Sequence, residues 1–418
     1  MKVIVAGQGY VGLPLAVRAA EAGHRVVGYD VDLHRIKRLT AAESYVEDVP
    51  SRQLLAVLES GAYTPTADPA ALAGFDIAVI TVPTPLRDGV PDLTHVESCA
   101  QVLGGHLRPG ATVVLESTSY PGTTEEVLLP ILEKASGLTG GAEFMAGFSP
   151  ERIAPGNKKF SFDATPKLVS GIDAKSLNAV KGFYDTLFQT TVPVSGPKVA
   201  EMAKLIENVF RLVNISLVNE LATLAAPLGV NVWEAIDAAA TKPFGFTRFT
   251  PGPGVGGHCL PVDPVFLSWK VQRDLGVPFR FVELAIDVNR RMPFYVVQRV
   301  TDALDRRRIP VAGSRILLLG LTYKINATDL RASPSARVAH LLAGLGAEVR
   351  GADPNVPEDQ AAQLKVPLVD ASAEEIAAAD AVVLLMDHAR FDLPAIESHA
   401  RYVLDCRNRL SGPNVETL

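Results

Sequence analysis

Cysteine is scarce in this sequence, and its scarcity excludes several classes of protein. Among 418 residues there are three cysteines, Cys99, Cys259 and Cys406, which lie far apart in the chain. An odd number of widely spaced cysteines argues against a disulfide framework and against a four-cysteine zinc site. We therefore expect no structural metal, and we expect a reducing, cytoplasmic compartment.

The sequence also lacks a targeting segment and a membrane-spanning run. The apolar stretch at the N-terminus is interrupted by glycines from residue 7 onward, and no cleavage region follows it. The most apolar later stretch, 209–230, contains an arginine, two asparagines and a glutamate, which are too costly inside a bilayer. We expect a protein without a membrane anchor.

Positive charge is not in excess, since the net charge is −6 and the pI is about 5.8. This balance argues against nucleic acid or an anionic membrane as the main partner, although a few basic residues can still bind a small anion. The apolar content of 48% argues against disorder. The length suggests two or three domains.

Short apolar runs alternate with helical patterns at both ends of the chain. This alternation predicts an α/β fold with two Rossmann-like, doubly wound parallel sheets, the second a weak repeat of the first. The expected strands are 3–6, 25–29, 77–82, 112–115 and 144–148, then 315–320, 347–351, 381–386 and 402–404.

The middle of the chain has a different pattern. A stretch from Lys198 to about Leu228 has apolar residues at helical spacing and predicts a long helix that joins the two lobes. A loop rich in glycine and proline, 243–264, follows it, and then a helical region to about Asp305. We expect an N-terminal domain over 1–195, a helical spacer over 196–305 and a C-terminal domain over 306–418.

The first strand runs into a glycine-rich turn that opens a helix. Gly7, Gly9 and Gly12 form a GxGxxG pattern, and Asp30 ends the next strand. Such glycines let a backbone approach a pyrophosphate at a helix N-terminus, and the acid can hold the adenosine ribose. The pattern predicts dinucleotide binding and favours NAD over NADP, with Arg35 either near the ribose or solvated.

Three other features could carry chemistry. Cys259 lies in the Gly/Pro-rich loop, where a thiolate could attack an aldehyde, but lone cysteines are also often buried for structural reasons. Lys204 and Asn208 lie one helical turn apart; the lysine could stabilise an oxyanion or could simply be solvated. Lys324 and Arg331 follow a strand, where a diphosphate could bind.

Taken together, these segments resemble the nucleotide-sugar 6-dehydrogenases, the UDP-glucose and GDP-mannose dehydrogenase family. The resemblance covers essentially the whole chain. Besides the Lys204/Asn208 helix, its carriers are GQGYVGLPLA at 7–16, STSYPGTT at 117–124, SPERIAPG at 149–156, GGHCLPVDP at 256–264 and TYKINATDLRASPS at 322–335.

The resemblance implies a four-electron oxidation of a sugar C6 alcohol to a carboxylate by two NAD molecules in turn, through a thioester on Cys259, for polysaccharide biosynthesis. It implies that Asp263 and Thr118 activate the hydrolytic water and that Lys204 and Asn208 stabilise oxyanions. The implied cofactor residues are Gly7, Gly9, Tyr10, Val11, Gly12, Asp30, Arg35, Thr84 and Thr118. The implied substrate residues are Glu151, Arg152, Lys204, Asn208, Arg248, Gly256, Lys324 and Arg331, with Glu151 also assisting hydrolysis.

Details within the motifs bear on the sugar. Glucose-oxidising members typically have an acid at the position of Pro155 and GGYCLPKD where this chain has GGHCLPVD. The departures resemble the branch that acts on UDP-N-acetylhexosamines, so we expect UDP-N-acetylglucosamine, then its manno epimer, then UDP-glucose. Arg248 is a candidate for reaching a neighbouring subunit's substrate, and we expect a homodimer. The alternatives are a two-electron 2-hydroxyacid dehydrogenase and a non-catalytic NAD-binding sensor.

Overall fold

A computed structural model of the chain describes residues 1–152, 162–257, 259–356 and 362–418. The chain divides into two compact units, Met1–Glu207 with Val265–Gly276, and Asn208–Pro264 with Val277–Leu418. Among the described residues, no helix is both long enough and apolar enough to cross a membrane.

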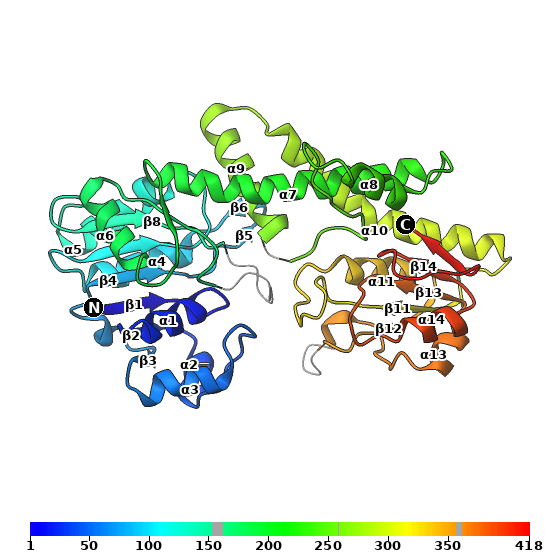
Figure 1. The fold of residues 1–418 in the computed structure, drawn as a ribbon, viewed down its shortest axis with the longest axis horizontal. Helices are drawn as coiled ribbons and strands as arrows, with labels where there is room; N and C mark the ends of the chain where they lie inside the picture. The colour runs from blue at the N-terminus through cyan, green and yellow to red at the C-terminus, as the bar shows by residue number, and fades with distance from the viewer. Residues whose placement is uncertain (153–161, 258, 357–361) are drawn as a thin grey trace. The chain divides into compact units, whose positions relative to one another are not determined.

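The first unit is built on a six-stranded parallel sheet, blue to cyan in Figure 1, in the order β3-β2-β1-β4-β7-β8. Its strands are β1 (Lys2–Ala6), β2 (Arg25–Tyr29), β3 (Tyr63–Thr66), β4 (Ile77–Ile80), β7 (Thr112–Leu115) and β8 (Met145–Phe148). The smaller strands are β5 (Leu86–Arg87) and β6 (Val90–Pro91), which pair antiparallel, and β9 (Lys167–Val169) and β10 (Thr191–Pro193), which pair in parallel.

Both faces of this sheet are buried, and β1 is accordingly apolar at every position from Val3 to Ala6. Val3 and Val5 pack in one hydrophobic cluster with α1, whereas Ile4 and Ala6 pack in another with α4. Continuous apolar strands are typical of parallel sheets covered on both faces. The helices of this unit are α1 (Gly12–Glu21), α2 (Leu33–Thr40), α3 (Ser51–Glu59), η1 (Pro69–Leu72), α4 (Thr94–Gly104), η2 (Thr124–Leu128), α5 (Leu129–Ser136) and α6 (Ala174–Tyr184).

The second unit contains a five-stranded parallel sheet in the order β12-β11-β13-β14-β15, yellow to red in Figure 1. The α/β fold with two Rossmann-like parallel sheets is therefore confirmed. Its strands are β11 (Arg315–Leu319), β12 (Glu348–Ala352), β13 (Ala381–Leu384), β14 (Val403–Asp405) and β15 (Val415–Thr417). Its shorter helices are α8 (Val232–Ala240), α11 (Pro334–Gly344), η3 (Ala362–Leu364), α13 (Ala373–Ala378) and α14 (Leu393–His399).

Three long helices lie between the two sheets along the chain: α7 (Pro197–Ala225), α9 (Cys259–Leu275) and α10 (Arg280–Arg306). α7 ends three residues before the expected Leu228, because Pro227 disfavours helical geometry in the residue before it. The expectation that 243–264 is all loop is wrong at its end, since Cys259 is the first residue of α9. Pro261 is tolerated there because first-turn N–H groups have no partner within the helix.

Candidate functional site

The glycine-rich turn between β1 and α1 has the geometry of a phosphate cradle. Gly7 has a φ of 94°, and a Cβ on Gly12 would overlap the Gly7 carbonyl oxygen. A Cβ on Gly9 would meet no atom within 4 Å, so this side of the turn is open. Val11 is the N-cap of α1, and the Tyr10 side chain is exposed. The turn therefore fits a dinucleotide pyrophosphate at the positive end of α1.

Asp30 lies at the end of β2, as expected, and is 5% exposed. Its carboxylate accepts the backbone N–H of Gln8 at 2.8 Å and that of Asp32 at 2.9 Å. The Arg35 guanidinium forms an ion pair with it at 3.3 Å. Arg35 therefore contacts Asp30 and is not simply solvated.

Thr84 and Thr118 follow β4 and β7 at the same edge of the sheet, where the strands carry their carboxyl ends. The Thr84 hydroxyl donates to the Thr118 carbonyl oxygen at 2.8 Å. In an open α/β sheet this edge binds ligands. The residues predicted for the cofactor thus come together within the first unit, and their chemistry fits NAD.

Lys204 is also in the first unit, and it is not a solvated lysine, because its side chain is 9% exposed. Its ammonium group donates to the Glu151 carbonyl oxygen. The neighbouring Arg152 forms an ion pair with Glu207 at 2.7 Å and donates to the Pro166 carbonyl oxygen at 2.7 Å. Glu151, Arg152 and Lys204 are therefore gathered around one stretch of α7.

Asn208 and Asp263 form a buried pair in the second unit. The Asn208 amide donates to a carboxylate oxygen of Asp263 at 2.6 Å, and both side chains are buried. Cys259 is exposed, whereas Cys99 and Cys406 are buried. A structural, core-filling role for Cys259 is therefore wrong, while Cys99 and Cys406 fit that role. His258, next to Cys259, and Pro155 lie outside the described residues.

The segment after β11 holds the residues expected to bind a diphosphate. Arg331 forms a forked ion pair with Asp329, with nitrogen–oxygen distances from 2.6 to 3.1 Å. Gly256 packs against this segment, and Gly257 donates its N–H to the Arg331 carbonyl oxygen at 3.0 Å. Arg248 is paired with Asp237 at 2.6 Å within its own unit.

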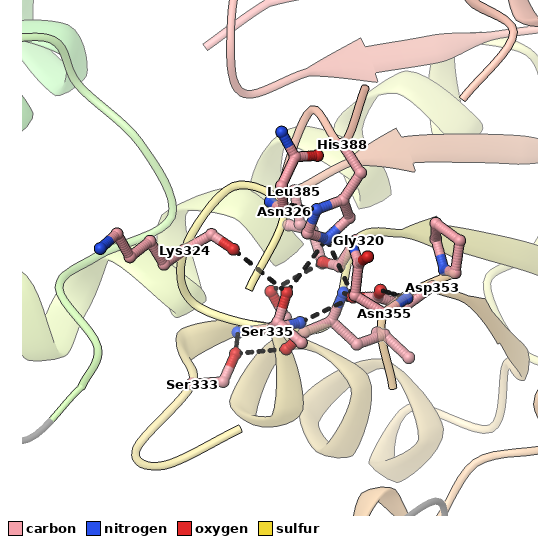
Figure 2. Close-up of polar contacts among 12 residues, drawn as sticks. Gly320, Lys324, Asn326, Ser333, Ser335, Asp353, Asn355, Leu385 and His388 are labelled. Carbon is pink, nitrogen blue, oxygen red and sulfur yellow. Dashed lines mark hydrogen bonds and ion pairs between the residues drawn. The ribbon is translucent and has the colours of Figure 1, made fainter. Parts of the chain in front are cut away.

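Figure 2 shows the polar contacts around the turn after β11. Asp353, at the end of β12, accepts the N–H groups of Leu321 at 2.6 Å and Thr322 at 2.9 Å, as Asp30 accepts that of Gln8. Here, however, the buried His388 also contacts the carboxylate, at 3.1 Å. The carboxylate of Asp353 is thus held by two backbone N–H groups and by the imidazole of His388.

His388 also fixes the orientation of the segment. Its Nδ1 accepts the backbone N–H of Asn326 at 2.9 Å, so the neutral ring carries its proton on Nε2, facing Asp353. Burial alone would raise the pKa of Asp353, but hydrogen bonds from His388 and from backbone N–H groups hold this pKa below its ordinary value. In Figure 2 the Lys324 ammonium points away from this cluster, so it is directed to other partners.

Sequence reasoning missed Arg407, which lies two residues after β14 at the carboxyl edge of the second sheet. Its Nε donates to the Leu385 carbonyl oxygen at 2.7 Å, and a Cβ on Gly252 would lie 2.9 Å from its Nη1. Burial lowers the pKa of its guanidinium. A basic residue two positions after a buried strand was the available signal.

Comparison with known proteins agrees with this geometry. Models of the UDP-glucose/GDP-mannose dehydrogenase family match in three parts: the NAD binding domain over residues 1–188, the central domain over 198–291 and the UDP binding domain over 317–412. The UDP-N-acetyl-D-glucosamine 6-dehydrogenase of Pseudomonas aeruginosa is 37% identical over 393 residues, covering 94% of this chain and 91% of the relative.

Two further comparisons concern Pyrococcus horikoshii. Its UDP-N-acetyl-D-mannosamine dehydrogenase is 35% identical over 421 residues, covering 99% of this chain and 97% of the relative. A solved structure of UDP-D-ManNAc dehydrogenase from this organism superposes with a TM-score of 0.91 at 33% identity, covering 100% of this chain and 99% of the other. Both alternatives, the non-catalytic sensor and the 2-hydroxyacid dehydrogenase, are therefore wrong. The chain belongs to the UDP-glucose/GDP-mannose dehydrogenase family and is an NAD-dependent UDP-sugar 6-dehydrogenase.

Proposed function

We propose that this enzyme oxidises the C6 alcohol of UDP-N-acetylglucosamine to the uronic acid through a thioester on Cys259. The observation that carries the proposal is the exposure of Cys259 at the start of α9, in the same unit as the buried Asn208–Asp263 pair. The N-terminus of a helix favours negative charge, and a thiolate is the nucleophilic form of cysteine. The name of the Pseudomonas aeruginosa relative supports the choice of sugar.

NAD, when bound, accepts a hydride from C6 in each of the two oxidations. Lys204 and Asn208 stabilise the negative charge that develops on the C6 oxygen as its proton leaves. The Cys259 thiolate then adds to the aldehyde carbon, and loss of the second hydride from this adduct leaves a thioester. One alcohol, one water and two NAD⁺ thus give one carboxylate, two NADH and three protons.

Hydrolysis of the thioester needs a base near the attacking water. Asp263 takes this role with Thr118, and Glu151 assists. The Asn208 amide holds the Asp263 carboxylate in one orientation, since their hydrogen bond is 2.6 Å long and buried. The water gives a proton to the base, attacks the carbonyl carbon and releases the Cys259 thiolate.

Cofactor binding rests on the first unit. The backbone of Gly7, Gly9, Tyr10, Val11 and Gly12 cradles the pyrophosphate, and Asp30 holds the ribose. Arg35, which pairs with Asp30, lies at the adenosine end. Thr84 and Thr118 line the nicotinamide side at the ends of β4 and β7.

Eight residues are assigned to the substrate. Lys324 and Arg331 bind the diphosphate as charge-assisted donors, and Gly256 lets the backbone approach the sugar. Glu151 and Arg152 contact the sugar, and Arg152 offers a donor for a 2-acetamido group. Arg248 reaches the substrate of a neighbouring subunit, which requires release of its ion pair with Asp237.

The manno epimer, UDP-N-acetylmannosamine, is the second candidate. A relative named for this substrate is 35% identical over 99% of the chain, close to the 37% of the relative named for the gluco epimer. Both sugars carry the 2-acetamido group, whereas UDP-glucose does not. UDP-glucose is the third candidate.

The proposal includes a division into three domains, 1–195, 196–305 and 306–418, and a homodimer. Exposed apolar side chains on α7 support a second copy as the occupant of that face. Leu217, Leu221 and Leu224 are 53%, 43% and 55% exposed, and they repeat at helical spacing. We place the enzyme in the cytoplasm, where the exposed Cys259 thiol stays reduced, and its product in polysaccharide biosynthesis.

The test is a panel of UDP-N-acetylglucosamine, UDP-N-acetylmannosamine, UDP-glucose and GDP-mannose at saturating NAD, followed by NADH absorbance. The 2-acetamido group finds hydrogen-bond partners, and a site built for it loses these when a hydroxyl replaces it. We expect kcat/KM for UDP-N-acetylglucosamine to exceed that for UDP-glucose by roughly 10- to 1,000-fold. A preference for UDP-glucose, or equal use of both, would contradict the assignment of the sugar.

A further inference from the structure

The two glycines that precede the nucleophile rest on the side chain of Tyr323. Gly257 has a φ of 86°, and a Cβ placed on it would lie 2.6 Å from the Cε2 and Cζ atoms of the Tyr323 ring. A Cβ on Gly256 would lie 2.6 Å from the Tyr323 Cβ. Real Cβ atoms do not approach other heavy atoms this closely, so the backbone contacts the tyrosine at both positions. The ring therefore bounds the space available to the turn that leads into Cys259.

A hydrogen bond joins the same two segments. The Gly257 N–H donates to the Arg331 carbonyl oxygen at 3.0 Å. Within the second segment, the Tyr323 N–H donates to the Asp329 carbonyl oxygen at 3.2 Å, and the Arg331 guanidinium pairs with the Asp329 carboxylate. Tyr323, Asp329 and Arg331 thus form one closed loop, and Gly257 is bound to two of its members.

The Tyr323 phenol is uncharged in this loop. Burial is the main reason why the pKa of Tyr323 rises to about 12, and the charge of the Asp329 carboxylate raises it further. The hydroxyl is therefore neutral at working pH, and the ring supports the glycines by packing.

We propose that Tyr323 is a positioning residue that couples the location of the Cys259 sulfur to the segment that binds the nucleotide. The inference rests on the proposed function, because it assumes that Cys259 is the nucleophile and that Lys324 and Arg331 bind the diphosphate. Tyr323 contacts both glycines of the turn, and its backbone N–H is bonded to Asp329, the ion-pair partner of Arg331. A nucleotide that engages the segment fixes the turn, so the sulfur is placed correctly only when a UDP-sugar is bound.

Removal of the ring acts unequally on the two oxidations. The first hydride transfer does not use the sulfur, whereas the second follows its addition to the aldehyde. Freedom at the turn therefore slows the second oxidation more than the first, since small displacements of a reacting group are costly.

The fold tolerates removal of the Tyr323 ring because the segment before Cys259 is also anchored upstream, at Gly252. The Gly252 N–H donates to Asn219 Oδ1 at 2.9 Å, and Asn219 is fully buried and donates to Asn289 at 2.9 Å. This anchor joins the loop to α7 and α10 independently of Tyr323. A smaller residue at 323 thus loosens the downstream end of the loop alone.

The test compares Tyr323→Ala with Tyr323→Phe, which keeps the ring and removes only the hydroxyl. Each variant is assayed for NADH formed per UDP-sugar consumed, for aldehyde captured by a hydrazine reagent, and for UDP affinity by calorimetry. We expect Tyr323→Ala to fall from two NADH per sugar toward one and to release at least about tenfold more aldehyde. We expect Tyr323→Phe to keep two NADH per sugar and to bind UDP within about threefold of the native enzyme.

Two results separate the outcomes. If Tyr323→Ala still makes two NADH per sugar with no added aldehyde, Tyr323 does not position the sulfur and the inference is wrong. If the native enzyme itself does not make two NADH per sugar, the proposed function fails instead. Should Tyr323→Ala not fold, Tyr323→Leu, which fills the space without a planar ring, is measured in the same way, with the same two results deciding.

Discussion

The Asn208 amide donates a 2.6 Å hydrogen bond to the Asp263 carboxylate. The two residues come from α7 and α9, are separated by 55 positions, and are almost wholly buried. An amide held against a carboxylate in a buried place orients it and leaves its second oxygen for another partner. The pair therefore acts as a unit in which Asn208 determines the orientation of the Asp263 carboxylate.

Asn208→Asp is expected to shift the pH dependence of activity. It places a second carboxylate against Asp263, and like charges at this distance raise the pKa of the pair. The base is then protonated at higher pH, so the acid limb of the kcat/KM profile should move upward by about one pH unit or more. Asn214→Asp on the same helix is the control, because the Asn214 amide donates to the backbone carbonyl of Phe210 in an exposed hydrogen bond. An unchanged acid limb in Asn208→Asp would show that Asp263 is not the titrating base.

Iodoacetamide is expected to modify one cysteine of the native enzyme. Burial raises the pKa of Cys99 to about 12 and that of Cys406 to about 12, so both remain neutral thiols at pH 8. Cys259 is the exposed cysteine. Peptide mass mapping should find label on Cys259 alone. The rate of carboxylate formation should fall in proportion to the fraction of Cys259 that is labelled. Label on Cys99 or Cys406 before Cys259 would contradict the burial seen here.

Lys167→Met is expected to lower the free energy of unfolding by about 3–5 kcal/mol. Lys167 and Glu116 form an ion pair in which neither side chain is more than 2% exposed. The Tyr184 hydroxyl donates to the other Glu116 oxygen at 2.5 Å. Removal of the lysine leaves a buried carboxylate with no opposite charge, which denaturant unfolding measures.

The double variant Lys167→Met/Glu116→Gln removes that charge and still offers an oxygen to Tyr184, so it should recover part of the loss. Lys175→Met, at an exposed position of α6, is the control and should change stability little. Equal stability of Lys167→Met and the native protein would show that the pair is not buried in solution.

Asp30→Asn is expected to narrow the preference for NAD over NADP. The native carboxylate repels a 2′-phosphate by about 1–3 kcal/mol, or roughly 5–150-fold in affinity. Asparagine removes the charge and keeps an oxygen for the Gln8 N–H. Asp32→Asn is the control, since it makes the same charge change two residues later and preserves the cap of α2. Equal use of both cofactors by the native enzyme would show that Asp30 does not face the ribose.

Features carried by neighbouring residues could be predicted from the sequence. The Gly7–Gly12 turn and Asp30 are readable because a strand, a turn and a helix follow each other directly. β3 was missed, since Tyr63–Thr66 contains a proline and no apolar alternation. The pattern of glycines and prolines predicted a loop at Cys259, whereas this exposed residue is the first of α9.

Contacts across long separations could not be predicted. The buried Lys204 ammonium donates to the carbonyl of Glu151, which is 53 residues away in the chain. The carboxylate of Asp353 contacts His388, which follows β13 and lies 35 residues away in the chain. Asn208 and Asp263 each looked suitable for catalysis, but no spacing rule indicates that they bond to each other. Such pairs are products of tertiary packing, which a single sequence does not reveal.

The most direct test of the account is the NADH yield of the native enzyme and of Cys259→Ala with limiting UDP-N-acetylglucosamine. The account predicts two NADH and one uronic acid per sugar for the native enzyme. For Cys259→Ala it predicts carboxylate formation slower by about 1,000-fold or more, because loss of a covalent nucleophile returns several kcal/mol to the barrier. Near-native conversion to the acid by Cys259→Ala would contradict it.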